Sequence, residues 1–217
     1  MIKAILWDND GVLVDTEYLF FEATRDGLRS LDIELSLDQF KEISLSEGRS
    51  CFDLASERGI ESTRIQRARE ERGAAYMVRI AAGVPLMEGV AETLAALADR
   101  LPMAMVTSSY PDHLSALHAP FGTLDHFEFV LACGSYTHHK PHPEPYLMAA
   151  ERLGVAPEDC LVVEDTERGL TAASRAGMTC VVIKHDLTAH QDFSQAFRIL
   201  DSIREVPAVL DELLAPA

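Results

Sequence analysis

The chain has 217 residues, with 19 lysines and arginines against 35 aspartates and glutamates, so its formal net charge is −16 at pH 7. Hydrophobic residues make up 47% of the sequence, which is ordinary for a globular protein and too many for a disordered one. A chain of this length suits one large or two small domains. Because so acidic a protein is repelled by phosphate backbones and by anionic lipid, we expect neither a nucleic-acid nor a membrane partner.

We expect no targeting segment in the first residues. Lys3 is followed by a short apolar run, Ala4 to Trp7, before Asp8 interrupts it. Such a run is too short for a signal peptide, and no run in the chain approaches the length of a membrane span. We therefore expect a cytoplasmic location.

The first predicted element is a buried strand over residues 2–7, which ends abruptly in the polar turn of residues 8–11 (DNDG). From about 16 to 82 the pattern is helical throughout and includes a long charged helix over 64–80. The sequence Gly83-Val84-Pro85 then breaks the helical pattern and indicates a linker.

After this linker, predicted helices and strands alternate. Continuous apolar strands separated by helices point to a parallel sheet covered on both faces. The first strand is of the same type, so we interpret the helical stretch as an insertion into one α/β domain. The predicted helices cover 88–99, 111–118, 143–153 and 167–176, and the predicted strands cover 102–107, 127–131, 160–164 and 179–183.

Polar residues gather where these strands end. In parallel sheets, ligands bind beyond the carboxyl ends of the strands. Neighbouring strands lie about 4.8 Å apart, so side chains from several ends can converge on one small ligand. The residues expected at this edge are Asp8, Asp10, Thr107, Ser108, Lys140, Glu164 and Asp165.

Carboxylates crowded in this way repel one another unless a cation lies among them. Oxygen ligands without a neighbouring His–Cys cluster favour a hard cation, and Mg²⁺ is the natural choice. One aspartate can then attack phosphorus while its neighbour moves protons. Lys140, the Thr107 hydroxyl and the backbone amide of Ser108 can neutralise phosphoryl oxygens.

These residues fall in segments that resemble the haloacid dehalogenase superfamily. Residues 8–16 (DNDGVLVDT) resemble its first motif, and the others follow in order: Thr107-Ser108, residues 140–146 (KPHPEPY) and residues 163–166 (VEDT). The resemblance covers essentially the whole chain and is closest to the branch of β-phosphoglucomutase-like and phosphoglycolate-phosphatase-like enzymes.

The resemblance implies a fold as well as a reaction. It implies a Rossmann-like parallel-sheet core over residues 1–15 and 84–217, with an all-helical cap domain over 16–83. It also implies a Mg²⁺-dependent phosphatase that acts on a small, sugar-phosphate-like phosphomonoester through an aspartyl-phosphate. We expect a monomer or a weak homodimer.

The roles of the acidic residues follow from the same resemblance. Asp8 would be the nucleophile, and Asp10 would be the general acid toward the leaving group and then the base toward water. The metal ligands would be the Asp8 carboxylate, the Asp10 backbone carbonyl, Asp165, and Glu164 directly or through water.

The resemblance also implies phosphate contacts. Thr107, Ser108 and Lys140 would hold the transferring phosphoryl group, and Thr16 is a further candidate for binding it. Gly11 would let the backbone approach the phosphate closely.

Two departures from the branch bear on the reaction. Relatives often carry a histidine where this chain has Phe20, and the polar residues of the mutase after the second motif are replaced by Tyr110-Pro111. Both changes favour hydrolysis over the mutase reaction. The alternatives left open are a β-phosphoglucomutase and a catalytically silent binding protein of the same fold. A receiver domain is disfavoured, because its phosphorylated aspartate ends a later strand.

Three further groups each allow two interpretations. Arg49 of the cap is a candidate contact for an anionic or hydroxyl-rich part of the substrate, or else a surface salt-bridge partner. Thr107 and Ser108 have the alternative of capping the helix over 111–118. Three histidines suggest a metal, but no fourth ligand follows at a standard spacing, so we expect exposed loop residues. They are His138, His139 and His142.

Overall fold

The computed structural model describes residues 1–215. The chain divides into two compact units. One unit combines Met1–Asp15 with the chain from Pro85 onward, and the other is the continuous segment Thr16–Val84. We call them the core unit and the helical unit.

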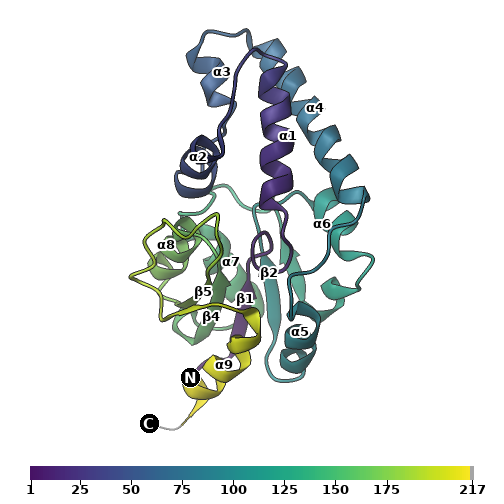
Figure 1. Cartoon of the computed structure of the whole chain (residues 1–217). Coiled ribbons are helices and arrows are strands. Elements are labelled where there is room, and N and C mark those ends of the chain that lie inside the picture. The colour runs from purple at the N-terminus through teal and green to yellow at the C-terminus, as the bar shows by residue number, and fades with distance from the viewer. Residues whose placement is uncertain (216–217) are drawn as a thin grey trace. The chain divides into compact units, whose positions relative to one another are not determined.

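A six-stranded parallel sheet forms the centre of the core unit (Figure 1). Its order is β3-β2-β1-β4-β5-β6, so the chain adds strands on one side of β1 before it crosses to the other side at β4. This is the Rossmann-like arrangement that we predicted, and its topological switch point lies between β1 and β4. The strands are β1 (Ala4–Trp7), β2 (Met103–Val106), β3 (Phe129–Leu131), β4 (Cys160–Glu164), β5 (Thr179–Ile183) and β6 (Arg198–Leu200).

Both faces of the sheet are buried, because successive side chains of a strand point to opposite faces. In β1, Ile5 and Trp7 belong to one apolar cluster and Ala4 and Leu6 to the other, and all four are fully buried. The first face is covered by α5 (Val90–Ala98), α6 (Pro111–His118) and α9 (Val206–Leu214). The second is covered by α7 (Glu144–Leu153) and α8 (Glu167–Arg175).

Several predicted elements begin and end where the structure has them, namely α6, β4 and β5. The sequence pattern did not indicate β6 or α9. β6 has only three residues, and two of them, Arg198 and Ile199, are exposed, so it shows no apolar run. A short edge strand of this kind is defined by its partner β5 rather than by its own composition.

The helical unit contains helices as predicted, but they are separate rather than continuous. Short turns interrupt them, and a capping box between Ser36 and Gln39 starts the second one. Among residues 1–215, no helix is both long and apolar enough to cross a bilayer. The elements are α1 (Glu17–Arg29), α2 (Leu37–Phe40), a π-helical turn (Lys41–Ser46), α3 (Asp53–Glu57) and α4 (Ser62–Ala81).

Candidate active site

Lys140 connects the carboxyl ends of the three central strands of the core unit. Its Nζ donates to Asp8 Oδ1 at 2.7 Å, to Glu164 Oε1 at 2.6 Å and to the carbonyl of Val106 at 2.9 Å. The side chain is 2% exposed. Burial alone would lower the pKa of Lys140, but the two carboxylates outweigh it and raise that pKa above its usual value. The ammonium is therefore charged, oriented and shielded from water.

Glu164 is fully buried, and hydrogen bonds occupy both of its oxygens. Oε1 accepts from Tyr146 at 2.6 Å in addition to Lys140, while Oε2 accepts from the backbone N–H groups of Asp165 and Thr166 at 3.1 and 3.3 Å. Burial raises the pKa of Glu164, but the charge and hydrogen bond of Lys140 bring it below its usual value. Glu164 is thus an anion that holds Lys140 in place.

Asp165 has one oxygen that lacks a protein partner. Oδ2 lies 2.8 Å from His185 Nε2, whereas Oδ1 is buried without a hydrogen bond. Burial, together with the neighbouring Glu164 carboxylate, raises the pKa of both Asp8 and Asp165 well above the usual value. Ligand oxygens of Asp8, Glu164 and Asp165 lie within 4.8 Å of one another. An unsatisfied oxygen in an all-oxygen, anionic cluster suits a hard cation such as Mg²⁺.

Hydroxyl groups of the loop after β2 contact the Asp10 carboxylate. Ser109 Oγ donates to Asp10 Oδ2 at 2.7 Å, and Thr107 Oγ1 lies 3.5 Å from the same oxygen. Thr107 Oγ1 also accepts from the Ser109 N–H at 3.0 Å, and Ser108 lies half-buried between them. The alternative in which Thr107 and Ser108 cap a helix is wrong, because α6 starts after Tyr110 and has no side-chain cap.

Hydrogen bonds of the buried Asn9 stabilise the turn between Asp8 and Asp10. Its carbonyl accepts from the backbone N–H groups of residues 12–14 at 3.2, 2.8 and 3.2 Å. Its Oδ1 lies 2.6 Å from Nε2 of the buried His118, whose Nδ1 lies 2.5 Å from Thr123 Oγ1. Burial lowers the pKa of His118 to about 4, against the opposing effect of the Asp10 charge. A neutral imidazole therefore secures this turn.

Gly11 is required by close packing at the same turn. Its φ of +77° lies in the left-handed region that favours glycine. A Cβ there would lie 2.1 Å from Asp165 Oδ2 and 2.9 Å from His185 Nε2. The sequence predicted that Gly11 makes room for a phosphate, and the structure adds that it makes room for Asp165.

Thr16 and Arg49 belong to the helical unit. Thr16 is buried at the start of α1, where its side chain makes no capping hydrogen bond. Arg49 is half-exposed and pairs with Glu47, Glu57 and Asp53 at 3.1, 3.0 and 3.5 Å. These ion pairs are what the salt-bridge interpretation of Arg49 predicts, and a contact with substrate stays a prediction.

Sequence reasoning missed Ser109, His118, Tyr146 and His185. His185 follows the end of β5, so the rule about carboxyl ends of strands could have found it. Ser109 is the third residue of a run of hydroxyl side chains, but nothing in the run indicates which of them contacts Asp10. His118 contacts Asn9 and Tyr146 contacts Glu164, and both partners are distant in sequence. No local sequence pattern indicates these contacts.

A parallel sheet with this strand order, carrying a lysine and clustered carboxylates at its switch point, is a Rossmann-like α/β fold with a charged site at the carboxyl ends of its strands. The chain belongs to the haloacid dehalogenase-like hydrolase family, whose sequence pattern matches residues 2–177. The match spans the first-strand turn, Lys140 and the acidic pair at the carboxyl end of β4.

Named relatives cover almost the whole chain. The protein CbbY of Cereibacter sphaeroides is 32% identical over 100% of this chain and 99% of its own length. The fructose-1-phosphate phosphatase YqaB of Escherichia coli is 28% identical over 83% of this chain and 95% of its own. The crystal structure of a CbbY variant from Rhodobacter sphaeroides in complex with xylulose-(1,5)bisphosphate superposes with a TM-score of 0.82, at 27% identity over 94% and 96% of the two chains.

Proposed function

We propose that this hydrolase removes phosphate from a small phosphorylated metabolite and that an aspartyl-phosphate forms on Asp8. The observation that carries the proposal is the buried Lys140, held between Asp8 and Glu164 at the switch point of the sheet. A fixed cation beside a carboxylate suits the transfer of an anionic phosphoryl group, because it stabilises charge without reorganisation.

In the first step, a carboxylate oxygen of Asp8 forms a bond to phosphorus while the bond between phosphorus and the ester oxygen breaks. The electron pair of that bond goes to the leaving oxygen, which takes a proton from Asp10. Ser109, which donates to Asp10 at 2.7 Å, orients the acid. Lys140, Thr107 and the Ser108 amide would bind the phosphoryl oxygens.

In the second step, water attacks phosphorus and gives its proton to Asp10. The bond between phosphorus and Asp8 breaks, which restores the carboxylate and releases inorganic phosphate. One residue thus acts first as acid and then as base.

Mg²⁺ is the metal that this set of oxygens fits. Asp8, Asp165 with its unpartnered Oδ1, and the backbone carbonyl of Asp10 would hold it, and the Glu164 charge would add to the attraction. When bound, the ion supplies charge neutralisation that lets the Asp8 carboxylate approach an anionic phosphate. His185, at 2.8 Å from Asp165 Oδ2, keeps the carboxylate oriented.

Sugar phosphates are the substrate class that we infer. One relative is named for fructose-1-phosphate, and another was crystallised with a sugar bisphosphate. We propose that residues 16–83 act as the cap that selects among such substrates. Replacement of Arg49 by alanine should then change the preference among sugar phosphates more than the turnover of a minimal aryl phosphate.

The test is hydrolysis of an aryl phosphate and of a panel of sugar phosphates, with Mg²⁺ and with EDTA. We expect turnover that requires the metal and is abolished in Asp8→Asn, because the asparagine amide cannot form the covalent intermediate. Asp99→Asn is the matched control, since Asp99 is exposed and lies between α5 and the amino end of β2. It should keep normal activity.

Two results would count against the proposal. Normal activity of Asp8→Asn would remove Asp8 as the nucleophile. Transfer of phosphate to a second position of a sugar, without release of inorganic phosphate, would indicate the mutase reaction instead.

A further inference from the structure

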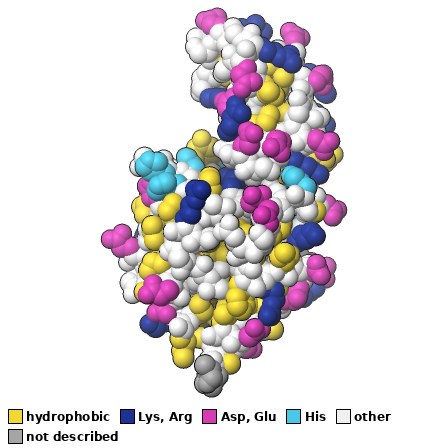
Figure 2. All heavy atoms as spheres, turned by 90° about the vertical axis from the view of Figure 1, so that its left-hand side faces the viewer, with side chains coloured by type: hydrophobic (Ala, Val, Ile, Leu, Met, Phe, Trp, Pro, Cys, Tyr) yellow, Lys and Arg dark blue, Asp and Glu magenta, His cyan; other side chains and the backbone are white. Residues whose placement is uncertain are grey.

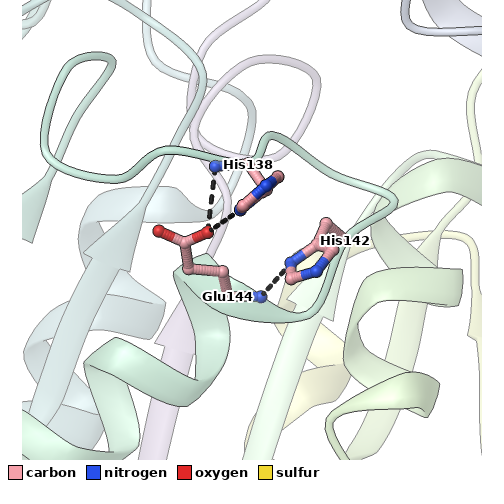
Figure 3. A group of neighbouring side chains, drawn as sticks. All are labelled: His138, His142 and Glu144. Carbon is pink, nitrogen blue, oxygen red and sulfur yellow. Dashed lines mark hydrogen bonds and ion pairs between the residues drawn. The ribbon is translucent and has the colours of Figure 1, made fainter.

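The loop that carries Lys140 inward presents a second group of metal ligands on its exposed side. His138, His142 and Glu144 each offer a ligand atom, and these atoms lie within 4.8 Å of one another (Figure 3). The His138 and His142 rings are stacked, with centroids 4.5 Å apart and planes at 29°. Acidic side chains are scattered over the face drawn in Figure 2, and histidine side chains form a group at its left-hand edge, with a separate histidine patch toward the right.

Glu144 is fixed in position before any ligand binds. Its Oε1 accepts from the Thr137 N–H at 2.8 Å, and its Oε2 accepts from the His138 N–H at 3.0 Å. The carboxylate is therefore already ordered, which reduces the entropy that a ligand would have to overcome.

Without a metal, hydrogen bonds occupy the nitrogen and oxygen atoms that would bind it. His138 Nδ1 is 2.5 Å from Glu144 Oε2, and His142 Nδ1 accepts from the Glu144 N–H at 3.1 Å. Metal–nitrogen and metal–oxygen bonds of about 2.0–2.2 Å require the two donor atoms to separate to about 3.2 Å. His138 is 61% exposed, so its ring can move by this amount, and water can replace the backbone hydrogen bond that His142 gives up.

We propose that His138, His142 and Glu144 bind one divalent transition-metal ion of the Zn²⁺ class. Two imidazoles and a carboxylate favour Zn²⁺, Cu²⁺ or Ni²⁺ over Mg²⁺, which prefers oxygen ligands. The site is distinct from the carboxylate cluster of Asp8 and Asp165, and it lacks the fourth protein ligand of a closed structural site. Water would complete the coordination at the exposed positions.

The test is a titration of the metal-free full-length protein with Zn²⁺, read by competition with a chromophoric chelator. Excess Mg²⁺ is present to keep the carboxylate cluster occupied. We expect one ion per chain, bound tightly enough to compete with the chelator. Titration with Co²⁺ should give the visible absorption of a nitrogen-ligated ion.

The variants His138→Gln and His142→Gln should each lower the Zn²⁺ affinity by about tenfold or more. His139→Gln is the matched control, because His139 is also exposed and lies on the same loop but faces the Tyr136 ring at 5.2 Å. It should bind like the parent chain. Equal binding by all three variants, or binding abolished by Asp165→Asn alone, would place the ion elsewhere and overturn the proposal.

Discussion

At the scale of single residues, we propose that Lys140 has two separable effects, one on stability and one on catalysis. Its ammonium neutralises the buried Glu164 carboxylate, which is 0% exposed. Removal of one partner of a buried ion pair costs about 3–5 kcal/mol, because the other charge stays buried without compensation. Hydrophobic replacement of the whole pair costs far less.

We predict that Lys140→Met lowers the free energy of unfolding by about 3–5 kcal/mol and the turnover by about 100-fold or more. In the double variant Lys140→Met/Glu164→Gln, most of the stability should return, because the amide oxygen can accept from the N–H groups of Asp165 and Thr166 while its NH2 donates to the Tyr146 hydroxyl oxygen. The turnover should stay low. Urea unfolding and steady-state kinetics of the parent chain and the two variants measure both quantities. Recovery of both stability and turnover in the double variant would show that Lys140 has only a structural role.

His118 makes stability depend on pH. Its pKa is about 4 in the folded protein, because of burial, against an ordinary value of 6.5. Between these values the unfolded chain binds a proton that the folded chain does not, so stability falls as the pH falls from 6.5 toward 4.

The expected loss from this histidine is about 2 kcal/mol between pH 7 and pH 5. Other groups also titrate, so the comparison is with His118→Gln, which should be less stable at pH 7 but less sensitive to acid. Urea unfolding at the two pH values gives the difference. If both proteins lose the same stability on acidification, His118 is protonated in the folded state.

At the scale of elements, the turn after β1 depends on Gly11 for two reasons, its backbone conformation and its contact with Asp165. A comparison with Gly154, at the end of α7, distinguishes these two reasons. Gly154 has a φ of +69°, close to that of Gly11, but no atom lies within 4 Å of where its Cβ would be.

We predict that Gly11→Ala and Gly154→Ala both lose about 1 kcal/mol of stability through backbone strain. Only Gly11→Ala should lose activity and require more Mg²⁺ for half-maximal rate, because its methyl group displaces the Asp165 carboxylate. Measuring turnover against Mg²⁺ concentration for both variants distinguishes the two effects. Equal Mg²⁺ requirements would contradict a role for the Asp165 carboxylate position in binding the metal.

The elements differ in how far the sequence predicts them. β4 and β5 are apolar runs apart from one polar residue at an end of each, Glu164 and Thr179, so their composition locates them. The candidate site follows from them, because Asp8, Glu164 and Asp165 stand where such runs stop. β6 is a strand because it pairs with β5, and the contact of His118 with Asn9 joins residues far apart in the chain. Neither can be read from a local pattern.

At the scale of the whole molecule, the formal net charge of −16 opposes the approach of an anionic phosphomonoester. Salt screens this repulsion over distances beyond about 10 Å, whereas the contact with the buried Lys140 is little affected. We therefore predict that KM falls by about twofold between low and physiological ionic strength, while kcat stays constant. Kinetics in a series of KCl concentrations test this, and a KM that rises with salt would indicate a positively charged approach to the site.

The strand order also has a consequence for synthesis. Ile5 of β1 pairs with Met103 and Leu161. The first strand is therefore translated long before the two strands with which it pairs. The segment Thr16–Val84 is continuous and can compact during that interval, since domains generally fold as units as they emerge. Lys140, Glu164 and Asp165 all lie in the last-made half of the chain. In the proposed mechanism, hydrolytic competence therefore arises only after Asp165 has been translated, and a nascent chain arrested before that point contains the proposed nucleophile Asp8 without the complete set of groups proposed to make it reactive.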